Sequence, residues 1–139
     1  MNKCLSLLCL PAFLLLAGCE NDAASLMIEG KEHSISFVRE QSIAWVGPVE
    51  QRFIVSRFPA CQRRYSVEPG DGSMQKIEMY EVQPRLYVAK QGSVMYALGT
   101  EECVLQKFKP EDKPAVVPGR LLGSFQKKDD KLVFVPATP

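Results

Sequence analysis

The sequence predicts an all-β protein, a small antiparallel β-sandwich or barrel of about eight or nine short strands held by one disulfide. Apolar and polar residues alternate with a period of two along most of the chain after residue 25, which is typical of half-buried strands. The 10 prolines and 9 glycines gather between these segments. Outside the N-terminal leader, apolar residues nowhere keep helical spacing for three turns. These observations favour a sandwich or barrel.

The expected strands follow one another at close spacing. A first hairpin joins residues 26–29 to 33–38 through a Gly30-Lys31 turn. The central strands are expected at 51–58, 74–82, 85–90, 93–98 and 102–108. A proline-rich connection, 109–118, leads to a final hairpin of 121–126 and 131–135. The short helical candidates are 39–45 and 110–113.

The first residues have the anatomy of a secretory signal peptide. Lys3 supplies a positive charge ahead of an apolar run that contains Pro11 and ends before a polar segment. A membrane-spanning helix needs about 20 apolar residues, and this run is too short. We therefore expect a leader over residues 1–18, a polar tether over 19–25 and a single domain over 26–139.

The leader ends in Leu16-Ala17-Gly18-Cys19, which resembles the lipobox of bacterial lipoproteins at every position. The resemblance implies cleavage between Gly18 and Cys19, a diacylglyceryl group on the Cys19 thiol and an acyl chain on its amino group. Such chains anchor a protein in a membrane without spanning it. The alternative is an ordinary secretory signal with a coincidental cysteine.

Lipoprotein sorting in enterobacteria depends on the residue after the lipidated cysteine, where aspartate favours retention in the inner membrane. This chain has Glu20 at that position. We expect a protein anchored to the outer membrane and facing the periplasm, with the inner membrane as the alternative.

Loss of the leader leaves few cysteines. Of the 5 in the chain, Cys4 and Cys9 lie in the leader and Cys19 carries lipid, so Cys61 and Cys103 remain. In an oxidising periplasm these two are expected to form one disulfide. A closed loop of about 40 residues corresponds to roughly 4 kcal/mol in the chain-entropy treatment. The alternatives are two free buried thiols or pairing with another protein.

Length and charge favour a single domain and argue against a nucleic-acid partner. Removal of residues 1–18 from the 139 leaves 121, enough for one domain with a modest core. Removal of Lys3 leaves 16 basic side chains, equal in number to the 16 acidic ones. A chain with a formal charge near zero and no basic block does not favour nucleic acid as a partner.

Catalytic and metal-binding patterns are absent from the sequence. His33 is the single histidine, and it is expected to be a partly exposed strand residue. No cofactor and no metal site is expected, because clustered His, Cys or carboxylate ligands are missing. The carboxylate pairs are expected to be solvated at loops or strand ends; they are Glu101-Glu102, Glu111-Asp112 and Asp129-Asp130.

The segment 57–65 is the most distinctive part of the domain. It places Arg57, Arg63, Arg64 and Tyr65 around a disulfide cysteine, and Arg and Tyr are enriched at binding hot spots. These four residues form a candidate partner patch. The alternative is a corner whose arginines pair with nearby glutamates. Trp45 has two interpretations, a ligand-stacking residue or a plug at one end of the fold.

We expect a lipid-anchored, periplasmic, non-enzymatic binding or assembly module, with the membrane and an envelope protein as partners. A second hypothesis is an inhibitor of a host or competitor enzyme such as lysozyme, since lipid-anchored β-domains of that kind form a family, although its motifs are missing here. A third is an enzyme whose site has no recognisable motif.

Overall fold

The computed structural model describes residues 21–43 and 46–139, and its fold is all-β. The described chain forms ten strands and one short 3₁₀ helix. The strands are β1 (Asn21–Glu29), β2 (His33–Glu40), β3 (Val49–Arg57), β4 (Cys61–Gly70), β5 (Ile77–Gln83), β6 (Leu86–Gln91), β7 (Val94–Gly99), β8 (Val104–Lys107), β9 (Arg120–Lys128) and β10 (Lys131–Pro136). The expected leader, Cys19 and Trp45 lie outside the described residues.

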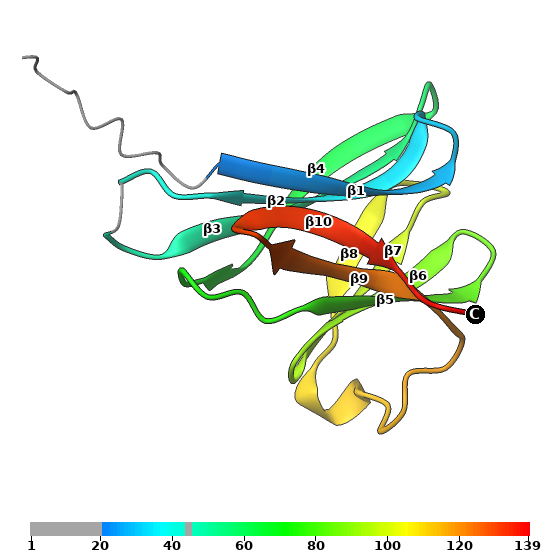
Figure 1. Ribbon diagram of the computed structural model, residues 1–139. Coiled ribbons are helices and arrows are strands. Elements are labelled where there is room, and N and C mark those ends of the chain that lie inside the picture. Colours follow the sequence, from blue (N-terminus) through cyan, green and yellow to red (C-terminus); the bar gives the residue numbers. More distant parts are fainter. Residues whose placement is uncertain (1–20, 44–45) are drawn as a thin grey trace, which may run out of the picture.

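The strands form two antiparallel sheets. One has the order β1-β2-β3-β4 and the other the order β10-β9-β5-β6-β7-β8. Figure 1 shows the four-stranded sheet lying over β10, β9 and β5 of the six-stranded sheet. At one side of the sandwich the edge strands β1 and β10 meet, where the Leu132 amide donates a hydrogen bond to the Asp22 carboxylate. At the other side, β4 is covalently linked to the turn before β8.

Aromatic side chains from both sheets fill the space between them. Phe37 and Phe53 pair across β2 and β3 with ring centroids 5.0 Å apart. Phe125 of β9 contacts both rings, at 5.9 and 6.5 Å, and contacts Phe134 of β10 at 5.0 Å. Phe37, Phe53 and Phe125 are fully buried. Aromatic pairs in this range add to the hydrophobic free energy of burial, so this cluster holds the two sheets together.

The strand count exceeds the expected eight or nine because the sequence pattern missed β4. This strand lies at the edge of its sheet and exposes most of its side chains. Most of its residues have no core to face, and its sequence therefore lacks the alternation that identified the other strands.

Two further expectations are corrected. The tether was expected to reach residue 25, but β1 begins at Asn21 and pairs with β2 from Asn21 opposite Glu40. Backbone pairing with β2 orders these small residues, and Ala24 packs against the core. The helical candidate at 39–45 is wrong at its start, because Arg39 and Glu40 complete β2. The 3₁₀ helix Pro110–Asp112 matches the other candidate.

Candidate functional site

The predicted disulfide between Cys61 and Cys103 is present, with a Cα–Cα distance of 6.0 Å. It joins the first residue of β4 to the turn between β7 and β8. Cys103 precedes its strand with a φ of 53° and is fully buried. We call the surrounding corner the disulfide end, defined by the disulfide and by His33, Arg57 and Thr100. Several side-chain hydrogen bonds and two ion pairs of Glu101 meet at this end.

His33 lies inside the disulfide end. The expectation of a partly exposed residue is wrong, because only 5% of His33 is exposed. Its Nε2 makes a 2.8 Å hydrogen bond with Thr100 Oγ1, and its Nδ1 lies 3.7 Å from a Glu29 carboxylate oxygen. A hydroxyl, an imidazole and a carboxylate in this order resemble a nucleophilic triad. Thr100 is 0% exposed, however, so a substrate has no access to its hydroxyl. The pair links β2 to the end of β7.

The sequence contained a signal for this burial. His33, Ile35 and Phe37 occupy alternate positions of β2 and therefore share one face, and all three are buried. The period-two rule assigns His33 to the core once its neighbours are assigned there. Thr100 gave no comparable signal, because it lies in a turn whose position depends on the two-sheet packing.

Arg57 crosses the disulfide end and donates to the backbone on the far side. Its Nε donates to Thr100 O at 3.0 Å and its Nη2 donates to Glu101 O at 2.7 Å. The same guanidinium lies 3.5 Å from the Glu101 carboxylate, which also pairs with Arg85. The hydrogen bond from Arg85 lowers the pKa of Glu101, and the charges of Arg85, Arg57 and His33 act in the same direction. Arg57 therefore has a structural role.

Tyr65 also makes its contacts inside the protein. Its hydroxyl donates a 2.6 Å hydrogen bond to Cys103 O, and its ring packs against the main core cluster. Tyr65 lies opposite Phe53 in the β3–β4 pairing, which places both on the inner face. Of the four residues in the candidate patch, Arg57 and Tyr65 thus connect β3 and β4 to the β7–β8 turn.

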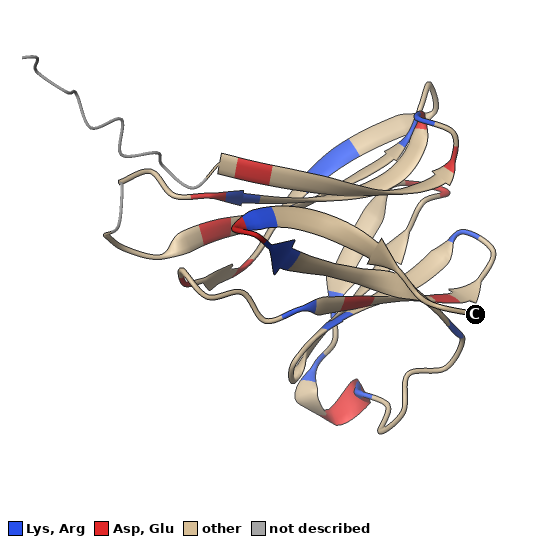
Figure 2. Cartoon of the chain, in the orientation of Figure 1, with Lys and Arg blue, Asp and Glu red and all other residues tan. Residues whose placement is uncertain are grey.

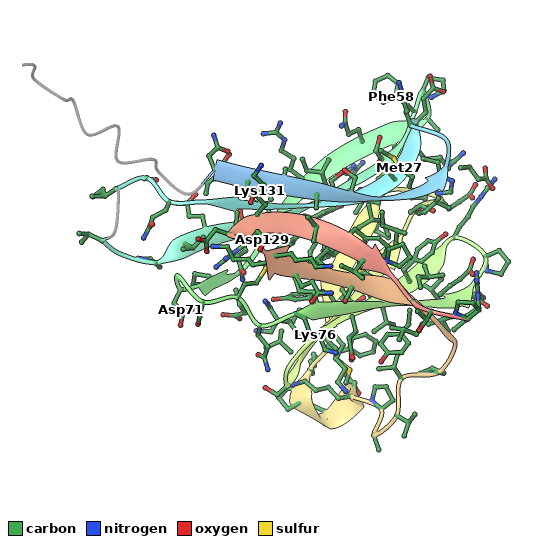
Figure 3. All side chains as sticks on the ribbon, in the orientation of Figure 1. Met27, Phe58, Asp71, Lys76, Asp129 and Lys131 are labelled. Carbon is green, nitrogen blue, oxygen red and sulfur yellow. A yellow bond between two sulfur atoms is a disulfide. The ribbon has the colours of Figure 1, made fainter. Side chains whose placement is uncertain are left out.

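Arg63 and Arg64 have a different environment. Both are exposed, and within the described residues neither guanidinium makes an ion pair or a hydrogen bond. Arg63 pairs with Val55 and Arg64 pairs with Ile54, so the two side chains leave opposite faces of the edge strand β4. They form part of the basic band on β4 in Figure 2. Phe58, in the turn before β4, is 56% exposed and is labelled at the same end of the molecule in Figure 3.

Two surface hollows adjoin β4. The smaller, of about 220 Å³, lies between Val67 of β4 and Leu105 of β8 and is crossed by the ion pair of Glu68 with Lys107. The larger, of about 560 Å³, lies at the far end of β4 and is lined by amide, hydroxyl and carboxylate side chains that include Gln51 and Asp71. Neither hollow is lined by a histidine or a cysteine.

Residues 21–43 and 46–139 contain neither a cluster of metal ligands nor a membrane-spanning helix. No group of three or more His, Cys, Asp or Glu side chains could hold a metal ion there. In the same part of the chain, no helix is long and apolar enough to cross a bilayer. The carboxylates of Glu111, Asp112, Asp129 and Asp130 are exposed in a 3₁₀ helix and a hairpin turn.

Comparisons with models of protein families, with curated proteins and with solved structures find no match for this chain.

Proposed function

We propose that this protein is a lipid-anchored, non-enzymatic binding module of the bacterial cell envelope, held on the periplasmic side of the outer membrane. The lipobox-like segment ending at Cys19 supports the anchor. The disulfide between Cys61 and Cys103 supports an oxidising compartment, because disulfides persist there and are rare in the cytosol. The buried position of Thr100 beside His33 supports a structural role for this pair, which resembles part of a catalytic set.

The observation that carries the binding proposal is the contrast among four arginines of the disulfide end. Arg57 and Arg85 are held by Glu101, whereas Arg63 and Arg64 are exposed without ion pairs among the described residues. A guanidinium that is not engaged by a neighbouring carboxylate can donate two parallel hydrogen bonds to a carboxylate of another protein. We propose that Arg63 and Arg64 bind acidic side chains of an envelope protein that lies along the outer edge of β4.

An edge strand suits this role. Its outer row of backbone N–H and C=O groups has no neighbouring strand in the four-stranded sheet. A partner segment that pairs with β4 would place its side chains beside Arg63 on one face and beside Arg64 on the other. Two adjacent positive charges on each copy also oppose pairing of β4 with a second copy of itself. Lysozyme inhibition is favoured by no feature of the described residues.

The test is site-specific crosslinking in intact cells. A photoreactive residue at Gln62, which is exposed between Cys61 and Arg63, should give one dominant adduct with an envelope protein. In the R63E/R64E variant that adduct should disappear, and the purified partner should bind at least about tenfold more weakly, since two charge-assisted hydrogen-bonding groups are lost. The control is K109E/K128E, which makes the same change of charge at exposed positions outside β4. Equal adducts in the two variants would refute the proposed surface.

The anchor has a separate test. A Cys19→Ser variant should leave the membrane fraction and appear in the soluble periplasmic fraction, because it has no thiol to carry the diacylglyceryl group. Retention of this variant in the membrane, with its leader removed, would contradict the lipid anchor and leave the β4 proposal standing.

A further inference from the structure

The connection between β2 and β3 exposes large apolar side chains. Ile43 is 65% exposed and Val46 is 63% exposed, and nothing in the described part of the fold covers them. Both lie in one short connection between Glu40 and Val49. Exposed apolar side chains that lie close together can contact another apolar phase.

This connection lies at the end of the molecule where β1 begins. Asn21 pairs with Glu40, three residues before Ile43. Figure 1 shows the start of β1 and the β2–β3 connection on one side of the sandwich and the C-terminus on the opposite side. We call this side the N-terminal end, defined by Asn21, Glu40, Ile43 and Val46. The disulfide end lies at the other ends of β2 and β3, next to His33 and Arg57.

The length of chain between the lipobox cysteine and the domain is very short. Cys19 precedes Asn21 by two residues, and two residues extend at most about 7 Å. Acyl chains on Cys19 would therefore hold the N-terminal end of the sandwich at the membrane surface. A domain held this close places the β2–β3 connection within reach of the same leaflet.

Charge at the N-terminal end is balanced and gives no net electrostatic attraction to anionic lipid. The β9–β10 turn at this end (Figure 3) carries two exposed lysines and two exposed aspartates, which are Lys128, Lys131, Asp129 and Asp130. Arg52 is paired with Glu40 and lies 2.6 Å from a Glu50 carboxylate oxygen. Its charge is compensated by these two partners, and the Asp22 carboxylate lies at the same end. A membrane contact here must therefore depend on apolar burial.

We propose that Ile43 and Val46 insert at the boundary between headgroups and acyl chains of the leaflet that holds Cys19. This inference rests on the lipid anchor of the proposed function. Two aliphatic side chains bind a bilayer only weakly on their own, but a covalent anchor keeps them at a high local concentration. This second contact fixes the orientation of the sandwich. It directs the disulfide end, with Arg63 and Arg64 of β4, away from the membrane.

The experiment uses the lipidated, mature protein in vesicles of phosphatidylethanolamine and phosphatidylglycerol that contain brominated acyl chains. Trp45 is the single tryptophan of the chain and the sequence neighbour of Val46, so its fluorescence reports this connection. Bromine should quench this fluorescence in the wild type. The I43S/V46S variant should show at least about twofold less quenching, because it replaces the inserting side chains with polar ones.

The control is Phe58→Ser, which removes an exposed apolar side chain at the disulfide end and should leave quenching unchanged. Salt at about 0.5 M should also leave it unchanged, since that concentration screens exposed charges but does not weaken apolar contacts. Equal quenching in the wild type and in vesicle-bound I43S/V46S, or loss of quenching in salt, would overturn the inference. Failure of the wild type to remain with the vesicles would instead refute the anchor.

Discussion

The two ends of the sandwich differ in the side chains that they bury and expose. At the disulfide end, the two sheets are joined by one disulfide, by the hydrogen bond between His33 and Thr100, and by hydrogen bonds that Arg57 and Tyr65 donate. At the N-terminal end, the β2–β3 connection leaves Ile43 and Val46 uncovered. The buried polar groups of the disulfide end have partners inside the protein, and its edge strand exposes Arg63 and Arg64, whereas the N-terminal end exposes two aliphatic side chains. This difference predicts that the polar contacts of the disulfide end contribute to stability, whereas the exposed side chains of Ile43 and Val46 contribute little to it.

The disulfide should give the largest stability effect at the disulfide end. The C61A/C103A variant should lose about 4 kcal/mol of unfolding free energy, because an unfolded chain without the bridge gains the entropy of a 42-residue loop. Urea denaturation of the soluble domain, followed by circular dichroism, measures the loss. The matched control is the wild-type domain under reducing conditions, which should show a similar loss. A loss below about 1 kcal/mol would show that the noncovalent network alone holds this end.

The hydrogen bond between His33 and Thr100 should give the next largest effect. Thr100→Val keeps the shape of the side chain but leaves the buried His33 Nε2 without its partner, which should cost about 1–3 kcal/mol. The control is Thr138→Val, at an exposed threonine near the C-terminus, which should be close to neutral. If both variants unfold at the same urea concentration, the pair does not contribute to the contrast between the ends.

The ion pair of Glu101 with Arg85 should make the disulfide end sensitive to acid. Arg85 lowers the pKa of Glu101 in the folded protein, so the native state favours the ionised carboxylate. This contribution is present above the unfolded pKa, about 4.3, and is lost as the pH falls through the lower folded value. The E101Q variant should therefore lose less stability than the wild type between neutral pH and acid. Urea midpoints along a pH series measure the difference.

Two controls sharpen the acid experiment. Glu102→Gln removes the neighbouring exposed carboxylate, which lies outside this ion pair, and should follow the wild type. High salt should reduce the difference between the wild type and E101Q, because both charges are solvent-exposed and therefore screened. A pH profile of E101Q that is parallel to the wild type at low salt would exclude this ion pair as the cause.

The sequence predicted the features that depend on local patterns and missed those that depend on contacts between distant residues. The strand His33–Glu40 was foreseen because its alternate residues Ile35 and Phe37 meet a core on one side. The edge strand Cys61–Gly70 was missed because its exposed, polar side chains carry no such pattern. The disulfide was foreseen from the compartment and the cysteine count. Periodicity therefore identifies strands that bury a face, and it misses strands held mainly by backbone pairing.

The candidate patch shows the limit of reasoning from neighbouring residues in sequence. Arg57, Arg63, Arg64 and Tyr65 were grouped by proximity along the chain, but the partners of Arg57 and Tyr65 lie in the β7–β8 turn of the other sheet. Thr100, Glu101 and Cys103 bind Arg57 and Tyr65 through contacts that span 38 to 44 positions. Which arginines bind inside the protein and which are exposed depends on how the two sheets pack. A single sequence does not specify that packing.

The smallest effect should come from the N-terminal end and tests the comparison most directly. Ile43→Ala and Ile35→Ala remove the same atoms, but Ile43 is 65% exposed and Ile35 is 0% exposed. Ile35→Ala should cost about 2–5 kcal/mol through lost burial and a cavity between the sheets. Ile43→Ala should change the unfolding free energy by no more than about 0.5 kcal/mol. Urea denaturation of the soluble domain measures both values under one condition.

If Ile43→Ala costs as much as Ile35→Ala, the β2–β3 connection is part of the core and its side chains are not available to a membrane. If it is neutral, Ile43 contributes little to the fold, and its side chain is available for the external apolar contact that the quenching experiment tests.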